Sequence, residues 1–342
     1  MIIHVTCNTD DNYVQHCCAM LCSLFENNKA EVFHVHILTH QLLDNHCFFL
    51  QKLSARYGNE CTIHEVEESK LRGVKFRKNR PLTMAAYYRI LLPEIIDDDI
   101  DKILYLDCDL VVLGNIRELY ETNIEGFAVA ACSDASPYND LHRQQLNLSL
   151  NEEAFCSGIL LVNLKYWRIH DATTKLLEYS QREKKEIFLH DQDSLNYVFR
   201  SQWLKLPYKW GVTPMSVCPM DNDQRDFDRF EYAFSPKIIH YAAALKPWKN
   251  LWFPDKKYYI RYLYESGFEN PNFTEVSLKY KLSTYKDIIR YYISKYVFPF
   301  IPDILMIPCR DVIFLLRLFI ASVSHPAKAK RLMLQRWLQK HR

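Results

Sequence analysis

The sequence contains no long uncharged apolar run and no excess of charge of one sign. No uncharged apolar run reaches 18 residues, and so we expect no transmembrane helix. Residues 1–6 include neither a basic region nor a long apolar core, so they are predicted to begin a strand and not a signal peptide. The 43 basic and 41 acidic residues leave a net charge of +2, which argues against a general nucleic-acid-binding protein.

The cysteine pattern excludes two other classes of protein. The chain has 11 cysteines, an odd number, with no Cys-x-x-Cys pair and no regular spacing. This pattern is typical of reduced, packed thiols and not of a disulfide framework or a zinc site, and it indicates a cytosolic protein. With 342 residues, 49% of them hydrophobic, the chain can bury a core for one large domain or two small ones.

The N-terminal part of the chain alternates apolar strands with amphipathic helices. We expect strands over residues 2–7, 32–39 and 61–66, and helices over residues 14–25 and 42–57. This β-α-β-α-β order predicts a parallel sheet covered by helices, with ligands bound beyond the carboxyl ends of the strands. The polar turn over residues 8–13 follows the first strand and can cap the next helix.

Two aspartates interrupt the apolar, strand-like run of residues 103–113. In a strand, residues two apart point to the same side, so Asp107 and Asp109 would converge while Cys108 packs behind them. Carboxylates at that spacing repel each other unless a proton or a cation lies between them. Mg²⁺ and Mn²⁺ take such oxygen ligands and keep places for the phosphate oxygens of a substrate. The alternative is a strand end whose acids cap the next helix, but the apolar flanks favour a site.

An arginine and a glycine indicate further close contacts. Arg89 lies in a helix expected over residues 82–92, which Pro93 should end. Arginine is usually solvated, but one among tyrosines and aliphatic side chains requires a carboxylate or a phosphate.

After the run of residues 103–113 we expect a short helical turn over residues 115–120, strands over 127–132 and 155–164, a polar loop over 133–153, and a helix over 165–179. Gly158, in the second of these strands, suggests a close backbone approach.

Three more polar residues begin or end elements in the second half of the chain. Asp191 and Gln192 open an apolar helix, where Asp191 or Asp193 alone would be an ordinary N-cap. His240 lies in a strand expected over residues 238–241, and a lone histidine at a strand end is more often structural than a ligand. Each of these explanations is sufficient for its residue taken alone.

Taken together and in this order, these segments resemble family 8 of the retaining glycosyltransferases, which includes bacterial lipopolysaccharide galactosyl- and glucosyltransferases and the glycogenins. The resemblance covers residues 1–260. The segments that carry it are residues 8–13, 87–89, 104–109, 155–158 and 191–193, and His240 with residues 246–248. A single Asp-x-Asp is weak evidence, whereas six ordered segments are strong evidence.

The resemblance implies a GT-A fold, in which a Rossmann-like nucleotide-binding sheet with helices on both faces is joined to an acceptor-binding part. It also implies a UDP-sugar donor, UDP-galactose or UDP-glucose, and Mn²⁺, with Mg²⁺ as the alternative ion. The implied metal ligands are Asp107, Asp109 and His240. A mixed set of this kind suits the borderline ion Mn²⁺ better than an all-oxygen set would.

The same resemblance assigns roles to the other site residues. The residues at the edge that holds uridine and ribose are Asn8, Asp10 and Asn12. Arg89 maps to a contact near the diphosphate or the sugar, and Lys246 maps to a phosphate contact. Cys108, between the two aspartates, belongs to the same donor-binding set. Asp191 and Gln192 map to the sugar and the reaction face. Because Gln192 is a poor nucleophile, we favour front-face attack by the acceptor, with a phosphate oxygen receiving its proton.

Three positions depart from the family pattern. Cys156 stands where many relatives carry asparagine, and Pro81 and Ala243 stand where a histidine and a glycine are frequent. Because the implied metal and phosphate ligands are present, these departures affect sugar choice and rate more than nucleotide or metal binding.

We therefore expect residues 1–260 to form a retaining hexosyltransferase domain and residues 261–342 to form a mainly helical extension. The acceptor is expected to be a glycan or glycolipid in lipopolysaccharide or other surface-glycan synthesis.

Residues 327–342 hold six basic residues and no acid, with Leu334, Trp337 and Leu338 on one helical face, which is typical of an interfacial helix. This pattern predicts attachment to an anionic membrane surface, the inner face of the cytoplasmic membrane. The alternative is a helix packed on the domain with a solvated basic face.

Two other functions fit single features of the sequence. A phosphohydrolase of the haloacid dehalogenase type also uses Asp-x-Asp after an apolar strand. Its nucleophile lies close to the chain start, whereas Asp107 follows three expected strands. A non-catalytic sugar-nucleotide-binding protein is the other alternative, and Cys156 is the feature that suggests it.

Overall fold

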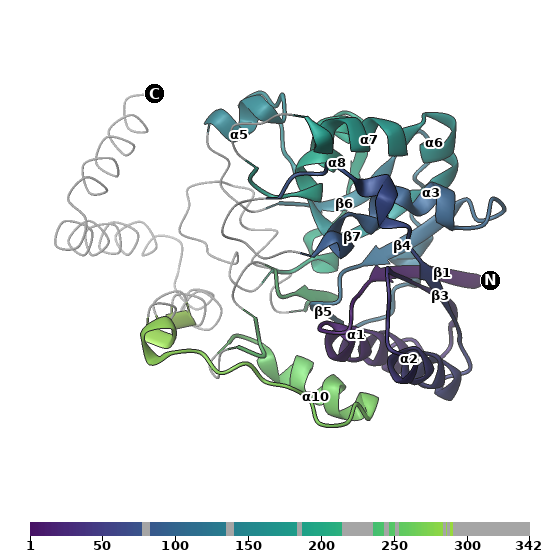
Figure 1. Cartoon of the computed structure of the whole chain (residues 1–342), viewed down its shortest axis with the longest axis vertical. Helices are drawn as coiled ribbons and strands as arrows, with labels where there is room; N and C mark the ends of the chain where they lie inside the picture. The colour runs from purple at the N-terminus through teal and green to yellow at the C-terminus, as the bar shows by residue number, and fades with distance from the viewer. Residues whose placement is uncertain are drawn as a thin grey trace.

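In the residues described by the computed structural model, a seven-stranded sheet with the order β3-β2-β1-β4-β7-β6-β8 forms the centre of the protein (Figure 1). Its strands are β1 (Ile2–Asn8), β2 (Val32–Thr39), β3 (Glu60–Glu65), β4 (Lys102–Leu106), β6 (Val129–Ser133), β7 (Phe155–Asn163) and β8 (Trp203–Lys205). β7 runs antiparallel to both of its neighbours, whereas the other pairings are parallel. The structure describes residues 1–76, 83–134, 140–182, 187–213, 235–242, 246–249, 253–282, 285, 288 and 289.

Helices cover both faces of this sheet (Figure 1). On one face, α1 (Val14–Glu26) and α2 (Asp44–Arg56) pack on the alternate apolar residues of β1, Ile3, Val5 and Cys7. The other face is covered by the 3₁₀ helix η2 (Met84–Leu91) and by α3 (Leu92–Ile95), α6 (Leu164–Ile169), α7 (Ala172–Gln181) and α8 (Asp191–Phe199). The β-α-β-α-β order and the two helical layers predicted from the sequence are confirmed.

A second, two-stranded sheet joins β5 (Leu110–Val112) to β9 (Ile238–His240) in antiparallel pairing. Nearby, α10 (Lys256–Ser266) lies against α1, where His16 Nδ1 is 2.7 Å from the Tyr259 hydroxyl. The remaining short elements are η1 (Glu68–Leu71), α4 (Arg117–Tyr120), α5 (Asp140–Gln145) and η3 (Tyr208–Trp210). α10 spans residue 260, and the proposed division at that residue stays a prediction.

The single strand predicted over residues 103–113 is wrong. β4 ends at Leu106, which pairs with Ile159, and β5 begins at Leu110, which pairs with His240. The two halves of the run therefore belong to different sheets, and the three residues between them form a turn. Apolar residues continue on both sides of the turn because both strands are buried, so the sequence pattern alone does not reveal the break.

Three other predicted elements differ from the structure. η2 is a 3₁₀ helix, and Pro93 does not end a helix but lies in the first turn of α3, where its missing N–H is tolerated. The helix predicted over residues 165–179 is divided into α6 and α7 at Asp171, which has φ of +50°. The loop predicted over residues 133–153 contains α5.

Two expectations concern membrane contact. No helix within the described residues is long and apolar enough to cross a membrane. Residues 327–342 lie outside the described residues, so the interfacial helix stays a prediction.

Pro81 and Ala243, two of the departures from the family pattern, also lie outside the described residues. Their effect on sugar choice and rate stays a prediction.

Candidate active site

The turn of residues 107–109 lies where β1, β4, β7 and β9 meet. The Asp107 N–H donates to the Gly158 carbonyl at 2.8 Å, and the Tyr241 N–H donates to the Asp109 carbonyl at 2.9 Å. Cys108 faces away from the carboxylates, and its thiol donates to the Asn8 carbonyl at 3.2 Å. The sequence expectation that Cys108 packs behind the two aspartates is confirmed, and its role in nucleotide binding stays a prediction.

The side chains of Asp107, Asp109 and His240 converge, with one ligand atom of each within 4.8 Å of the others. His240 Nε2 is 3.1 Å from Asp109 Oδ1 and 3.6 Å from Asp107 Oδ2. The pairing of Leu110 with His240 between β5 and β9 brings the histidine to the turn. Two carboxylate oxygens and one imidazole nitrogen suit a divalent ion such as Mn²⁺.

Gly158 allows His240 and Asp107 to lie directly against the backbone of β7. A Cβ at this position would lie 2.2 Å from His240 Cε1 and 2.8 Å from Asp107 Oδ2. Both distances are too short for any side chain, so the predicted close backbone approach at Gly158 is confirmed. The space that a methyl group would fill is the space that the proposed ligands His240 and Asp107 occupy, so a glycine at this position allows the three ligand atoms to converge and the residues present fit a metal ion.

Arg89, in η2, is buried and holds the turn of residues 107–109 in place. Its Nη2 donates to Asp107 Oδ1 at 2.8 Å, and its Nη1 donates to the Ser157 carbonyl at 2.6 Å. Its guanidinium also lies 4.0 Å from the ring centre of Tyr105, whose hydroxyl donates to Asp107 Oδ1 at 2.7 Å. The carboxylate partner expected for a buried arginine is thus present. Arg89 positions Asp107, and its role near the diphosphate stays a prediction.

Lys246 lies on the other side of the turn and is 9% exposed. Its Nζ donates to Asp109 Oδ2 and, at 2.9 Å, to the Tyr241 carbonyl. Burial raises the pKa of Asp109, but Lys246 and His240 outweigh it and hold that pKa below its ordinary value. Burial likewise raises the pKa of Asp107, but Arg89 and His240 together outweigh it and hold that pKa below its ordinary value. Both carboxyl groups of the turn are therefore ionised at neutral pH.

Asp191 meets this cluster through Arg89, because its Oδ2 is 3.3 Å from Arg89 Nε. Burial raises the pKa of Asp191 to about 6, although the guanidinium opposes the shift, and Asp107 adds to it. The ordinary N-cap role does not apply to Asp191, since His190 occupies that position with φ of +56°. It does not apply to Asp193 either, whose Oδ2 accepts the N–H groups of residues 188 and 189.

Gln192 is held between two elements. Its Oε1 accepts from the Ser157 N–H at 2.9 Å, and its Nε2 donates to Asp134 Oδ2 at 2.6 Å. Ser157 and Tyr105 were not singled out in the sequence, although both lie in apolar strands, where a polar group requires a partner. Cys156, beside them, has its sulfur 3.6 Å from His240 Nδ1 and so contacts the rear of the proposed metal ligand.

The predicted nucleotide edge lies at the carboxyl end of β1. Asn8 Nδ2 donates to the Ala85 carbonyl at 2.8 Å, while its Oδ1 is buried and has no hydrogen-bond donor among the described residues. Asp10 Oδ1 accepts the N–H groups of Asn12 at 3.0 Å and Tyr13 at 3.1 Å. Asp10 therefore shapes the turn before α1, and of these predicted residues Asn8 alone offers a buried free acceptor.

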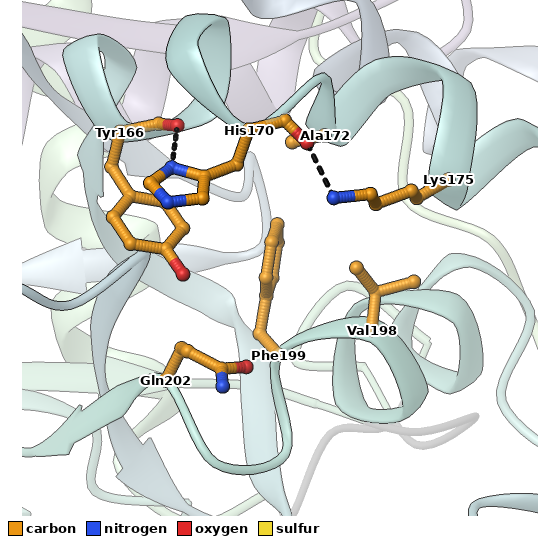
Figure 2. A pocket seen from close by; sticks show the side chains of 7 residues that line it. All are labelled: Tyr166, His170, Ala172, Lys175, Val198, Phe199 and Gln202. Atoms are coloured by element: carbon orange, nitrogen blue, oxygen red, sulfur yellow. Dashed lines mark hydrogen bonds between the residues drawn. The ribbon is translucent and has the colours of Figure 1, made fainter.

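A separate pocket lies at the far end of α8 from Asp191 and Gln192 (Figure 2). The residues that line it are Tyr166, His170, Ala172, Lys175, Val198, Phe199 and Gln202. Lys175 Nζ donates to the His170 carbonyl at 2.6 Å, as Figure 2 shows. Because its lining contains no carboxylate and no residue of the cluster around Asp107, we assign the pocket no part in the chemistry.

Comparisons with known proteins agree with this geometry. The sequence profile of glycosyl transferase family 8 matches residues 4–251. General stress protein A of Bacillus subtilis (strain 168) is 28% identical over 270 residues, which cover 77% of this chain and 93% of the relative. Lipopolysaccharide 1,2-glucosyltransferase of Escherichia coli is 25% identical over 248 residues, which cover 72% and 73%.

A solved structure supports the fold. The galactosyltransferase LgtC, in complex with donor and acceptor sugar analogues, is similar with a TM-score of 0.67 at 23% sequence identity, over 81% of this chain and 99% of that chain. The likeness confirms the GT-A fold class expected from the sequence. Together with the profile match over most of the chain, it shows that this protein belongs to glycosyl transferase family 8 and is a glycosyltransferase.

Proposed function

We propose that this chain moves galactose or glucose from a UDP-sugar to a glycan or glycolipid acceptor with retention of configuration. The observation that carries the proposal is the convergence of Asp107, Asp109 and His240 next to Lys246 and Arg89. The hexose and the surface-glycan acceptor are supported by relatives named lipopolysaccharide 1,2-glucosyltransferase in Escherichia coli and lipopolysaccharide 1,3-galactosyltransferase in Salmonella typhimurium, the latter 23% identical.

The donor site follows from the charges around the turn. Asp107, Asp109 and His240 would hold Mn²⁺, or Mg²⁺ as the alternative, and the bound ion would supply Lewis-acid stabilisation of the diphosphate. Lys246 already lies at Asp109 and adds a positive charge for the phosphate that leaves. The unpaired acceptor Asn8 Oδ1 offers a hydrogen-bond site for a donor group of uridine or ribose at the end of β1.

The reaction face is formed by the first residues of α8. Gln192 is a poor nucleophile, and its amide oxygen already accepts from Ser157, which favours a front-face route over a covalent intermediate. In that route the acceptor hydroxyl attacks from the leaving-group side and a phosphate oxygen receives its proton. Asp191 is placed to accept hydrogen bonds from sugar hydroxyls, and Arg89 holds it close to Asp107.

A panel of UDP-sugars tests this function against its alternatives. With Mn²⁺, the protein should hydrolyse UDP-glucose or UDP-galactose slowly, but faster than it hydrolyses other UDP-sugars. EDTA should stop the reaction. Cleavage of simple phosphomonoesters would instead indicate a phosphohydrolase, and hydrolysis of neither class would indicate a non-catalytic binding protein. Asp109→Asn should abolish the Mn²⁺-dependent hydrolysis, and Asp98→Asn is its matched control, because the side chain of Asp98 is 96% exposed.

We also propose that the enzyme works at the inner face of the cytoplasmic membrane, attached peripherally. The support is the composition of residues 327–342, six basic residues without an acid. A membrane-embedded glycolipid acceptor would make such attachment useful, since donor and acceptor then meet at one surface.

A further inference from the structure

Four histidines lie on three adjacent strands at the edge of the sheet opposite β8. His4 is on β1, His34 and His36 are on β2, and His64 is on β3. The parallel register pairs His4 with His34 and places His36 two residues further along β2. Because side chains two apart in a strand share a face, and neighbours in register point to the same side, the imidazoles gather on one face.

The ring nitrogens of three of these histidines are at the spacing of metal ligands. His4 Nδ1 and His36 Nε2 are 3.2 Å apart, and one nitrogen of each of His4, His34 and His36 lies within 4.8 Å of the others. Zinc–nitrogen bonds of about 2.0 to 2.1 Å in a tetrahedral site place two ligand nitrogens about 3.4 Å apart. The first pair is therefore already at ligand spacing, while the ring of His34, stacked 4.1 Å from that of His36, requires a rotation of its side chain.

The second ring nitrogens of His34 and His36 have the partners that orient metal ligands. His36 Nδ1 is 3.0 Å from His64 Nε2, and His34 Nε2 is 2.8 Å from Thr62 Oγ1. In metal sites the second nitrogen of a ligand histidine is usually held by such a hydrogen bond, which fixes the tautomer and the ring. The atoms that would bind the ion are His36 Nε2, which lies next to His4 Nδ1, and His34 Nδ1, which also lies 3.7 Å from Glu60 Oε2.

The imidazoles of the cluster are held in the neutral form, which is the form that binds a metal ion. Burial lowers the pKa of His4 and of His64, and the carboxylates of Asp97 and Asp99 oppose this shift at His4, as Asp97 does at His64. The loop that carries them is fixed by Arg168, whose Nη2 donates to the Ile96 and Asp97 carbonyls at 2.9 and 3.0 Å. His36 is buried, but His4 and His34 are partly exposed, so an ion can reach the cluster from solvent.

The histidine cluster differs from the active site in place and in chemistry. His4 precedes Asn8 by four residues along β1, which is about 13 Å at 3.3 Å per residue. Imidazole ligands suit Zn²⁺, Cu²⁺ and Ni²⁺, whereas carboxylate ligands suit Mg²⁺ and Mn²⁺. An ion held here would not serve the diphosphate.

We propose that His4, His34 and His36 form a second metal site, which binds Zn²⁺ or another ion that prefers imidazole ligands. His64 is the residue that orients His36. The ion would join β1 to β2 and leave its fourth place to water. A hydrogen-bonded stack of metal-free histidines is the competing explanation, and zinc binding separates the two.

Zinc binding to the full-length protein, measured by competition with a chromophoric chelator, tests the site. His36→Asn and His4→Asn should each weaken the affinity of this site for zinc by more than a hundredfold, and His64→Asn should weaken it by about 10- to 100-fold, the cost of losing an orienting partner. His240→Asn should leave this site intact, although it removes a ligand of the active site. His170→Asn, an exposed histidine outside both clusters, is the matched control.

A second readout keeps the test decisive if His36→Asn does not fold. Cobalt added to the His240→Asn protein should give the intense visible bands of a tetrahedral nitrogen site, and His34→Asn, whose side chain is partly exposed, should remove them. The proposal is overturned if the His240→Asn protein takes up no zinc at micromolar concentration. It is also overturned if folded His4→Asn and His34→Asn proteins bind zinc as tightly as the protein without these substitutions.

Discussion

Replacing Asp191 by asparagine should separate the function of this residue from its effect on stability. The carboxyl group is 6% exposed, and burial raises its pKa from 3.8 to about 6, with Arg89 opposing the shift. Asparagine has nearly the same shape but carries no charge. Arg89 keeps Asp107 and the Ser157 carbonyl as partners in the variant, so its buried charge stays paired.

The sign of the effect follows from proton binding. Because the folded pKa of Asp191 is above the unfolded one, the folded protein binds the proton more tightly between about pH 4 and pH 6. The free energy of unfolding therefore falls as the pH rises through this window, and above it the protein bears the full cost of the buried charge. Two pKa units correspond to about 3 kcal/mol, an upper value because the variant also loses the contact with Arg89.

Urea unfolding in EDTA at a series of pH values measures this cost. The Asp191→Asn protein should be as stable as the original or less stable at pH 4, and should become the more stable of the two, by about 1 to 3 kcal/mol, above pH 7. Asp193→Asn is a contrasting control in the same helical turn. Asparagine has one acceptor oxygen where the carboxylate has two, so either the N–H groups of residues 188 and 189 or His142 loses an acceptor. The variant should therefore be less stable by about 1 to 3 kcal/mol at neutral pH.

Activity should move in the opposite direction. Asp191→Asn should lower turnover of the UDP-sugar by about a hundredfold or more, the scale observed when one positioned polar group is lost, with UDP affinity unchanged. Parallel stability curves for the two proteins across pH 4 to 8 would show that the carboxyl group carries no burial cost. Normal turnover, or a parallel loss of UDP binding, would refute its assignment to the reaction face.

Three further predictions address the metal, the glycine and the C-terminal segment. Asp109→Ala should abolish Mn²⁺-dependent UDP binding in calorimetry while circular dichroism stays unchanged, and undiminished binding would remove Asp109 from the metal site. Gly158→Ala should weaken Mn²⁺ binding more than tenfold, because the new Cβ overlaps His240. Gly114→Ala should leave Mn²⁺ binding unchanged, because its new Cβ meets only the flexible side chain of Lys237. Equal Mn²⁺ affinities of the two variants would contradict the close approach at Gly158. Removing residues 327–342 should release the protein from anionic liposomes and preserve donor hydrolysis. Each basic residue near the membrane surface contributes about 1 kcal/mol to binding, and this attraction decays within a Debye length. If the truncated protein still cosediments as well as the full chain, the segment packs on the domain and does not bind the membrane.

Local sequence patterns predicted the elements whose partners are close in the chain. The first three strands and two helices alternate with clear periodicity, and they pair with their sequence neighbours. The break at Asp107 was not predictable from the run of residues 103–113, because it depends on two strands, β7 and β9, that follow much later. The 3₁₀ form of η2, which contains the buried Arg89, likewise could not be distinguished from an α-helix by the helical spacing of its apolar residues.

The same distinction applies to the candidate site. The carboxylate pair and Arg89 stood out because charges are rare among apolar residues, and the structure places them in contact. His240 had no local signal of its own and was selected through the resemblance. Ser157 and Tyr105 were missed because a hydroxyl in a strand is common, and their importance appears only when their partners across the sheet are known.

The pairing of β5 with β9 determines when the catalytic cluster can exist. Asp109 and His240 are 131 residues apart in sequence, and the short sheet that joins them is the contact that brings the histidine to the turn. Contacts of such high sequence separation form late, because the chain must close a long loop before it gains from them. During synthesis, both aspartates therefore leave the ribosome long before their imidazole partner, and a chain that ends before β9 contains the seven strands of the large sheet but lacks one of the three proposed metal ligands.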